Sequence, residues 1–229
     1  MAQYVIATIK SWNIENSRKL TEAFPEDTFY VITEKEELTL DRLDEINPRY
    51  VFFPHWSWII PQEIFDSYEC VVFHMTDLPF GRGGSPLQNL LVRGIYETKL
   101  SAIKVEKGVD TGPVYLKKEL DISTGNADEI LSKISSIIFE QMIPEFINGC
   151  LVSHEQTGEV VTFKRRTPDQ SRIPDGLTQR QLYDYIRMLD GEGYPTAYKD
   201  MGEVRVYFRN AHFDGENVHA EAEIVRRDE

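Results

Sequence analysis

The sequence has few cysteines and lacks any long apolar run. Its two cysteines, Cys70 and Cys150, lie far apart without a CxxC spacing, so neither a zinc site nor a disulfide framework is indicated. No apolar segment approaches membrane-spanning length, and the first residues, Met-Ala-Gln-Tyr, carry no basic-then-apolar signal. We therefore expect a cytoplasmic protein with no membrane partner.

Positive charge is also scarce. Lys and Arg number 25 against 38 Asp and Glu, and the net charge is −13. This balance argues against a broad electrostatic grip on nucleic acid, because binding to phosphates depends on clustered cations. Lys164, Arg165 and Arg166 form the only obvious basic patch. We expect no nucleic-acid partner.

The motifs of several common chemistries are missing. The first apolar run is followed by Lys10-Ser11-Trp12-Asn13, without the glycines of a dinucleotide-binding turn. Residues 81–85 lack the Lys-Ser/Thr ending of a phosphate-binding loop, and Ser85 does not lie in a GxSxG elbow. Histidines and acidic residues are too scattered for a metal site, so no metal is expected.

Short β-branched runs alternate with helical patterns through the first 150 residues. The expected strands are residues 4–9, 28–33, 50–54, 71–74, 101–106 and 114–120, and the expected helices are 14–24, 61–65, 86–98 and 126–147. Asn126 and Glu129 can cap the last of these helices. The alternation predicts an α/β fold, with a Rossmann-like, mostly parallel sheet and helices on both faces.

The C-terminal third has a different pattern. A helix is expected over residues 177–189, where Thr178 and Gln181 form a capping box, and alternating runs at 204–208 and 218–224 indicate antiparallel strands. We therefore predict a domain at 1–152, a polar connector at 153–176 and a small α+β unit at 177–229.

Polar side chains gather around the stretch 70–86, where an apolar strand leads into His74, a Gly-rich loop and a helix. This arrangement is typical of the ligand-binding corner of an open α/β sheet. His74 suits a general acid or an oxyanion partner, and a histidine bonded to loop backbone is equally consistent. Asp110 lies in a glycine-bracketed turn, where an Asp that bonds its own turn is the commoner case. His55 lies beside Trp56 and Trp58, and a simply packed ring remains open.

Four ordered motifs resemble the folate-dependent formyltransferases. The string His74-Met-Thr-Asp-Leu-Pro-Phe-Gly-Arg-Gly-Gly-Ser-Pro86 is similar to the family's H-x-x-x-L-P-x-x-R-G-x-x-P signature. Residues 109–113 resemble its D-T-G-P turn, and residues 58–61 its I-L-P segment. Residues 187–189 with 193–198 resemble the IRAL and YP-A-F patterns that follow the catalytic domain. The likeness covers about residues 50–198.

The resemblance implies transfer of a formyl group from N10-formyltetrahydrofolate to an amine. His74 takes the place of the family's catalytic histidine and Asp110 that of its catalytic aspartate. The folate is expected to contact Phe52, Phe53, Pro54, Phe80, Arg82, Gly83, Val105, Lys107, Gly108 and Asp110. The expected contacts of the acceptor are Trp56, Asp77, Arg82, Ser85 and Asn89.

One position departs from the family. Two residues before the histidine the family has an Asn, and this chain has Val72. An apolar side chain cannot donate to a developing oxyanion, and loss of one such donor typically costs about 3 kcal/mol. We expect His55, or Asn89 in the next helix, to replace it. A non-catalytic folate- or nucleotide-binding relative is the alternative.

The acceptor expected from the resemblance is an amino sugar. Net charge −13 and a short tail oppose a tRNA substrate, and the aromatic segment at residues 54–58 is most similar to sugar N-formyltransferases. The expected substrate is a nucleotide-linked amino-dideoxy sugar, such as a UDP-4-amino-4,6-dideoxy sugar of a pseudaminic acid type pathway. Methionyl-tRNA or another amine is the alternative acceptor, and a homodimer is expected.

Overall fold

The computed structural model describes residues 1–227, which group into two compact units. The first unit contains Met1–Arg82, Lys99–Leu120 and Ser132–Val161, and the second contains Gly83–Thr98, Asp121–Leu131 and the chain from Thr162 onward. The boundaries between the units fall inside five continuous elements, so this grouping does not follow the linear order. The predicted domains, 1–152, 153–176 and 177–229, stay a prediction.

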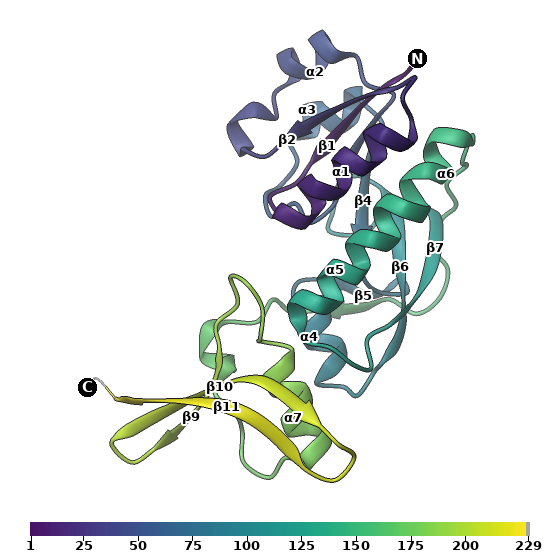
Figure 1. Ribbon diagram of the computed structural model, residues 1–229. Helices are drawn as coiled ribbons and strands as arrows, with labels where there is room; N and C mark the ends of the chain where they lie inside the picture. Colours follow the sequence, from purple (N-terminus) through teal and green to yellow (C-terminus); the bar gives the residue numbers. More distant parts are fainter. Residues whose placement is uncertain (228–229) are drawn as a thin grey trace. The chain divides into compact units, whose positions relative to one another are not determined.

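A six-stranded sheet forms the centre of the first unit (Figure 1). Its strands, in the order β2-β1-β3-β4-β6-β7, are β1 (Gln3–Ala7), β2 (Thr28–Ile32), β3 (Tyr50–Phe53), β4 (Cys70–His74), β6 (Glu97–Lys104) and β7 (Val114–Asp121). The pairs β1–β2, β1–β3 and β3–β4 are parallel, whereas β4 and β6 run antiparallel. The predicted Rossmann-like, mostly parallel sheet is confirmed.

Helices cover both faces of this sheet, which explains why its central strands are apolar without interruption. On one face, Val5, Val51 and Phe53 pack against residues of α2 (Leu40–Ile46) and α3 (Gln62–Ser67). On the other face, the Phe52 ring lies 5.4 Å from that of Phe146 in α6 (Ile143–Asn148). Alternate residues of one strand therefore enter two different cores.

The long helix expected at residues 126–147 is present as three consecutive segments. These are α5 (Ala127–Ile137), a π-helical turn (Ile138–Met142) and α6. Asn126 and Glu129 exchange backbone and side-chain hydrogen bonds, as the predicted capping box requires. In the first unit, Asn16 of α1 (Ser11–Ala23) donates to Ser135 of this helix, over 2.8 Å.

The second unit combines helices with a three-stranded antiparallel sheet. Its elements are α4 (Pro86–Leu91), α7 (Gln179–Arg187), β9 (Ala197–Met201), β10 (Val204–Phe213) and β11 (Val218–Arg226), and the sheet order is β11-β10-β9. Both pairings in the sheet are antiparallel. The helix followed by antiparallel strands that the sequence predicted is confirmed.

The helix expected over residues 86–98 is shorter than predicted. It ends as α4 at Leu91, and Gly94 follows with a left-handed φ of 66°. Glycine adopts that conformation without strain and commonly follows a helix end. Residues from Glu97 onward join the central sheet instead, because pairing with β4 outweighs local helix propensity. A two-stranded sheet of β5 (Phe80–Gly83) and β8 (Val161–Phe163) was not predicted.

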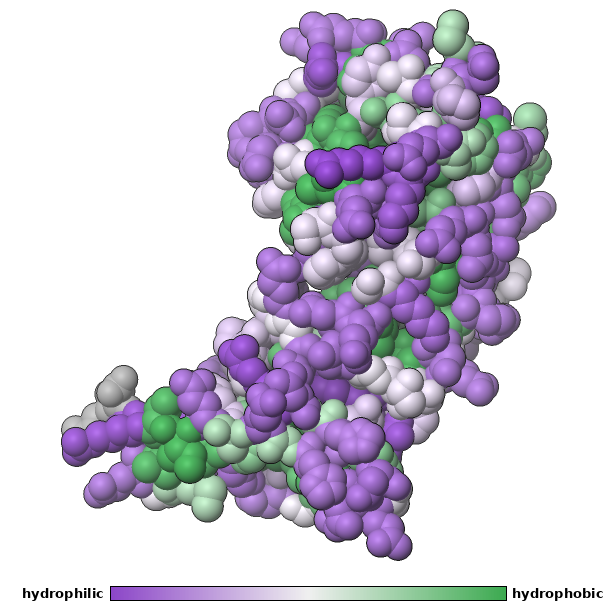
Figure 2. Space-filling model, viewed as in Figure 1, coloured by the Kyte–Doolittle hydropathy of each residue, from purple (hydrophilic) through white to green (hydrophobic). Residues whose placement is uncertain are grey.

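Charged and polar residues dominate the visible surface, and apolar residues gather on part of the three-stranded sheet (Figure 2). Met201 and Ile224 are exposed there. Within residues 1–227, no helix is long and apolar enough to cross a membrane. The cytoplasmic location stays a prediction.

Candidate active site

His74 is the last residue of β4 and is almost completely buried, with 8% of its surface exposed. The strand is short and apolar, so its end places the imidazole at the carboxyl edge of the parallel strands. The Nε2 atom lies 2.8 Å from the carbonyl oxygen of Gly81, and Nδ1 lies 3.4 Å from Oδ2 of Asp110. Both partners are acceptors, so an imidazolium satisfies both contacts and a neutral ring satisfies one.

Asp110 comes from the turn between β6 and β7, and it has a left-handed φ of 53°. Asp tolerates this conformation better than most residues. Gly112 is required in the same turn, because a Cβ there would lie 1.9 Å from the Lys104 carbonyl oxygen. The structure thus brings together His74 and Asp110, the two catalytic residues that the sequence predicted.

Gln156 links this pair to Arg82. Nothing in the sequence indicated a role for Gln156, which lies in the predicted polar connector. Its Oε1 accepts from Nε and Nη2 of Arg82, over 3.0 and 2.8 Å. Its Nε2 donates to the carbonyl oxygens of Asp110 and Gly112, over 2.9 and 2.7 Å. Arg82 was predicted to contact the folate or the acceptor. In the structure, its guanidinium binds the side-chain amide of Gln156 instead.

His55 lies two residues beyond β3 and has a left-handed φ of 55°. Its Nδ1 is 3.1 Å from Nδ2 of the buried Asn13, an amide that can only donate, so Nδ1 accepts and the neutral ring carries its proton on Nε2. Burial, with a smaller effect of the Lys10 ammonium, lowers the pKa of His55 to about 4. His55 is therefore a neutral donor at physiological pH. Asn13 was not predicted, although its position after the first strand was a usable signal.

Val72 offers no donor at the position where the family has an Asn. It pairs with Phe53 of β3 and Ile103 of β6, and its half-buried side chain packs against the apolar core. Phe53 and Val72 are paired; His74 lies two residues further along β4, and His55 lies two residues past Phe53, in the turn that follows β3. The register therefore places both imidazoles at the same edge of the sheet.

Several predicted folate contacts have backbone groups that the fold already uses. Phe52 and Phe53 pair within the sheet, and the Pro54 carbonyl oxygen accepts from Asn13 over 3.2 Å. The Val105 N–H donates to the Cys70 carbonyl. The Lys107 carbonyl accepts from Thr111, whose side chain also lies against Gly108.

Buried donors beside these segments remain for a ligand. Among residues 1–227, the indole N–H groups of Trp12 and Trp56 are buried without a hydrogen-bond partner. Trp56 packs against Phe53, and the Trp12 ring lies edge-on to His55. A buried donor without a partner is rare in native proteins. The pair therefore fits a ligand rich in acceptor atoms, such as a pterin.

Asp77, a predicted acceptor contact, is held by two lysines. Lys117 donates to one carboxylate oxygen and Lys99 lies 3.3 Å from the other. Burial raises the pKa of Asp77, but Lys117 and Lys99 outweigh it, so the net pKa is lowered. Its contacts are those of a structural ion pair. Phe80 begins β5 and is half-buried.

Gly83, Ser85 and Asn89 belong to the second unit. The Asn89 amide donates to the carbonyl oxygens of Gly84, Ser85 and Lys164, each over 3.0 Å, and its Oδ1 accepts from Arg93. A Cβ on Gly83 would lie 2.4 Å from the Phe163 carbonyl oxygen, and the Ser85 hydroxyl accepts from the Arg166 N–H. These residues join two segments of one unit. The expected replacement of the missing donor by Asn89 would require these bonds to exchange.

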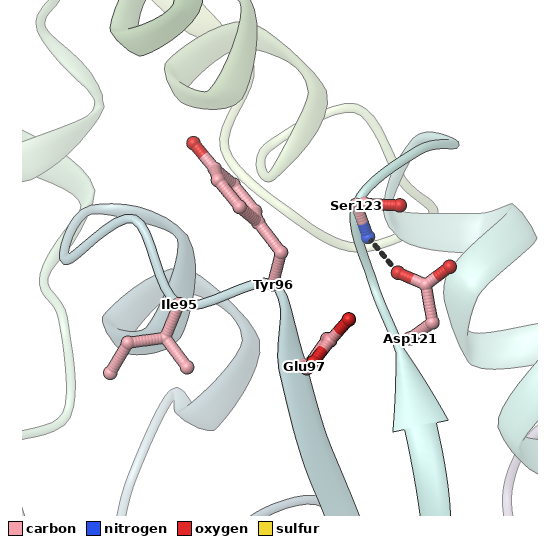
Figure 3. A pocket seen from close by; sticks show the side chains of 5 residues that line it. All are labelled: Ile95, Tyr96, Glu97, Asp121 and Ser123. Carbon is pink, nitrogen blue, oxygen red and sulfur yellow. Dashed lines mark hydrogen bonds between the residues drawn. The ribbon is translucent and has the colours of Figure 1, made fainter.

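A pocket of about 500 Å³ lies in the second unit and contains none of the predicted site residues. It is lined by Ile95, Tyr96, Glu97, Asp121 and Ser123 (Figure 3). Asp121 accepts from the Ser123 N–H over 2.7 Å, a local contact at the end of β7. The pocket is open and acidic, and we assign it no role.

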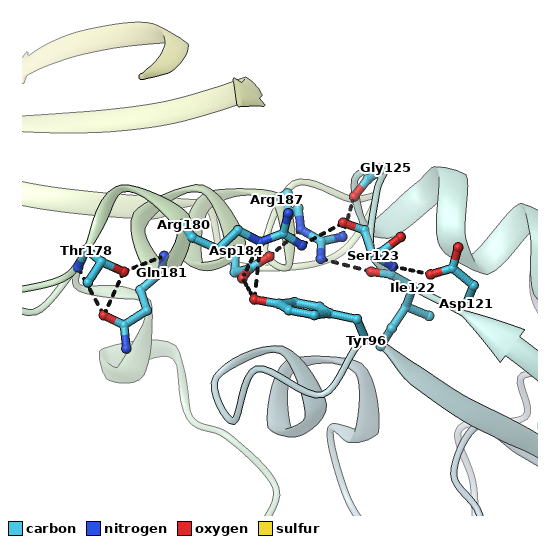
Figure 4. Close-up of polar contacts among 10 residues, drawn as sticks. All are labelled: Tyr96, Asp121, Ile122, Ser123, Gly125, Thr178, Arg180, Gln181, Asp184 and Arg187. Carbon is cyan, nitrogen blue, oxygen red and sulfur yellow. Dashed lines mark hydrogen bonds and ion pairs between the residues drawn. The ribbon is translucent and has the colours of Figure 1, made fainter. Parts of the chain in front are cut away.

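The wall of this pocket belongs to a buried polar network around α7 (Figure 4). The Tyr96 hydroxyl donates to Asp184 over 2.7 Å. Arg187, which is fully buried, pairs with Asp184 over 2.7 Å and donates to the carbonyl oxygens of Ile122 and Gly125. Arg180 packs on the Tyr96 ring, 4.2 Å from its centre. Every contact is internal, so the network is structural.

Two family models match the chain. Residues 13–146 match the model described as formyl transferase, and residues 168–225 match the C-terminal domain of methionyl-tRNA formyltransferase. The chain belongs to the formyltransferase family. The family uses N10-formyltetrahydrofolate, and at that level the predicted enzyme class and co-substrate are confirmed.

Individual relatives point to one branch of this family. A methionyl-tRNA formyltransferase from Thermodesulfovibrio yellowstonii is 28% identical over 75% of this chain and 57% of its own length. The chain thus spans about half the length of the curated relatives it matches. The structure of a methionyl-tRNA formyltransferase from Clostridium thermocellum is 50% identical, covers 99% of this chain and all of its own, and has a TM-score of 0.94.

These relatives overturn two predictions. A sugar N-formyltransferase from Shewanella has a TM-score of 0.70 over 92% of this chain and 97% of its own, but at 16% identity this likeness shows the fold alone. The predicted acceptor, a nucleotide-linked amino sugar of a pseudaminic acid type pathway, is wrong, and so is the exclusion of nucleic acid. The reason is physical: net charge is an average over the chain and does not report a local basic segment. The homodimer and the individual site residues stay predictions.

Proposed function

We propose that the protein transfers the formyl group of N10-formyltetrahydrofolate to the amino group of methionyl-tRNA. The observation that carries the formyl transfer is the contact of buried His74 with Asp110 at the carboxyl edge of the sheet. The tRNA acceptor is supported by the 50% identity to the Clostridium thermocellum enzyme and by the match of residues 168–225.

The folate supplies the activated formyl group, and the side chains of the chain supply charge and proton handling. Nε2–H of His74 is a donor for the negative charge that develops on the formyl oxygen, once it leaves the Gly81 carbonyl. The Asp110 carboxylate faces Nδ1, so it orients the ring and stabilises an imidazolium. It also accepts a proton from the attacking amine, directly or through water, and tetrahydrofolate leaves with a proton at N10 as its bond to the formyl carbon breaks.

His55 is the second donor of this proposal. Its Nε2–H is fixed by the Asn13 hydrogen bond, and its neutral state at physiological pH avoids repulsion with a charged His74. The register of β3 and β4 places it at the same edge of the sheet as His74. It is therefore a better replacement for the missing Asn than Asn89, whose amide is fully bonded. Trp12 and Trp56 are proposed to donate to the folate.

The first experiment measures formylation of methionyl-tRNA by the purified protein with N10-formyltetrahydrofolate. Formyl-methionine released from the tRNA is quantified by mass. We expect Asp110→Asn and His74→Gln to lower kcat by roughly 100- to 10,000-fold, the usual contribution of a positioned acid–base group. Asp66→Asn and His219→Gln, which change exposed residues of the same types, serve as matched controls with wild-type rates.

The outcomes separate the parts of the proposal. No formylation of methionyl-tRNA by the wild-type chain, alongside measurable folate binding, would favour a non-catalytic folate-binding protein, as Val72 allows. Formylation of another amine instead would overturn the acceptor. Wild-type kcat in His74→Gln would remove the proposed catalytic centre itself.

A further inference from the structure

Gln156 makes four hydrogen bonds, and their chemistry leaves one orientation for its amide. Arg82 can only donate, so the atom that it contacts must be the amide oxygen. The carbonyls of Asp110 and Gly112 can only accept, so the atom that they contact must be the amide nitrogen. The two groups of partners therefore require the same orientation, and no other side chain of this size combines both roles.

These bonds close a ring through the candidate catalytic pair. From Nε2 of His74 the ring passes to the Gly81 carbonyl, and along the chain to Arg82. It continues from the Arg82 guanidinium through the Gln156 amide to the backbone of Asp110. The Asp110 carboxylate then returns to Nδ1 of His74 over 3.4 Å. All members of the ring lie in the first unit.

The turn that carries Asp110 needs such a support. Asp110 has a φ of 53°, a conformation that few non-glycine residues adopt. Such a conformation is kept only where contacts with the surrounding structure hold it in place. Gln156 donates to the carbonyl oxygens of Asp110 and Gly112 in this turn. Gly112 itself packs tightly against the Lys104 carbonyl. The Gln156 amide thus links the strained Asp110 residue to Gly112, whose position is fixed by its packing.

We propose that Gln156 is a positioning residue, which holds the Asp110 carboxylate at the His74 imidazole by binding the Asp110 turn and Arg82 together. The kinetic side of this inference rests on the function proposed above. Arg82 acts here through Gln156, and its guanidinium fork fixes which way the amide points.

The sharpest variant is Gln156→Glu. It keeps an acceptor for Arg82, now as a carboxylate that forms an ion pair with the guanidinium, but it replaces the donor to the two carbonyls with an oxygen. We expect kcat for formylation to fall about 100-fold, as for a reacting group misplaced by about 1 Å, with KM for both substrates unchanged. Gln62→Glu, on exposed α3, is the matched control and keeps the wild-type kcat. Wild-type kcat in Gln156→Glu, or a loss confined to KM, would overturn the proposal.

A double variant tests the ring itself. Gln156→Met removes all four bonds, and Arg82→Met removes the two bonds at its other end. If Arg82 acts through Gln156, the double variant has the kcat of Gln156→Met alone, because residues acting as one unit are not additive. Multiplied losses would show that Arg82 acts independently and would contradict the ring.

A measurement without substrate separates this inference from the proposed function. The ¹⁵N signals of His74, identified by their loss in His74→Gln, report which ring nitrogens carry protons. At one fixed pH, we expect Gln156→Met to lower the fraction with a proton on Nδ1, because the Asp110 acceptor is no longer held there. Unchanged His74 signals would overturn the positioning role, even if methionyl-tRNA proved not to be the acceptor.

Discussion

Two histidines at one edge of the sheet differ in what surrounds them. Both nitrogens of His74 face acceptors, one of them a carboxylate. His55 faces the amide N–H of Asn13 and no acid among its hydrogen-bond partners in residues 1–227. Burial then lowers the pKa of His55 to about 4. The residue type is the same, but the neighbours decide which imidazole suits a charged role and which a neutral one.

The lowered pKa of His55 predicts a loss of stability in acid. The unfolded chain binds a proton at this residue near pH 6.5 and the folded protein only near pH 4, so folding stability falls as pH decreases through that window. We expect His55→Gln, whose side chain does not titrate, to lose less free energy of unfolding than the wild type between those pH values. Urea titrations give the free energy of unfolding of both proteins at each pH. The contributions of the other titrating groups cancel in the difference between the two proteins. Equal losses would contradict a His55 that is neutral in the folded protein.

At the scale of elements, α7 shows both what local sequence predicts and what it misses. Its capping box of Thr178 and Gln181 forms as expected. The same helix carries Asp184 and Arg187, charged residues that a helical pattern alone places on a solvent-facing side, yet both are buried. Their partners, Tyr96, Ile122 and Gly125, are distant in sequence. Burial of this pair depends on those carbonyls and that hydroxyl.

Breaking the α7 network is expected to destabilise the protein strongly. Arg187→Met leaves Asp184 with Arg180 and Tyr96 only, and it removes the donor to the buried Ile122 carbonyl and to the part-buried Gly125 carbonyl, so we expect a loss of about 3 kcal/mol in the free energy of unfolding. Thr178→Ala, which removes only the cap of the same helix, is the matched comparison and should cost about 1 kcal/mol. Both values come from urea unfolding curves. A loss for Arg187→Met no larger than that for Thr178→Ala would show that the network is not held tightly.

Over the whole molecule, the acidic charge is distributed unevenly. Residues 162–187 contain six Lys and Arg against three Asp and Glu, although the chain as a whole has a net charge of −13. Lys164 and Arg165 are exposed in this segment, whereas Arg166 is half-buried and bonds to Tyr185. An acidic protein can bind a polyanion through such a segment, since phosphate contacts are local and the total charge acts mainly as long-range repulsion.

This charge distribution predicts that tRNA binding depends on salt concentration. We expect Lys164→Ala combined with Arg165→Ala to raise the KM for methionyl-tRNA and to reduce the slope of log KM against log salt by about 2, one for each lost phosphate contact. The KM for the folate should not change. Arg18→Ala combined with Lys35→Ala, which removes two exposed cations of the first unit, is the charge-matched control. Equal effects of the two pairs would indicate total charge rather than a local contact.

The alternation of apolar runs, the two capping boxes and the order of the four motifs were enough to predict the Rossmann-like sheet, the C-terminal α+β unit and the pair His74 and Asp110. Each of these depends on neighbours in the sequence or on a motif carried by the chain itself. The end of α4 was predicted too late because strand pairing of β6 with β4 is a long-range contact, which local propensity does not report.

Only the tertiary structure decided how the candidate site is held. Gln156 looked like any residue of a polar connector, and it becomes the link between Arg82 and Asp110 through atoms that the fold brings together. The proton position of His55 depends on Asn13, an amide of helix α1. Hydrogen bonds are directional and reach about 3 Å, so the roles of these side chains follow from the placement of their partners in space, which residue type and spacing do not specify.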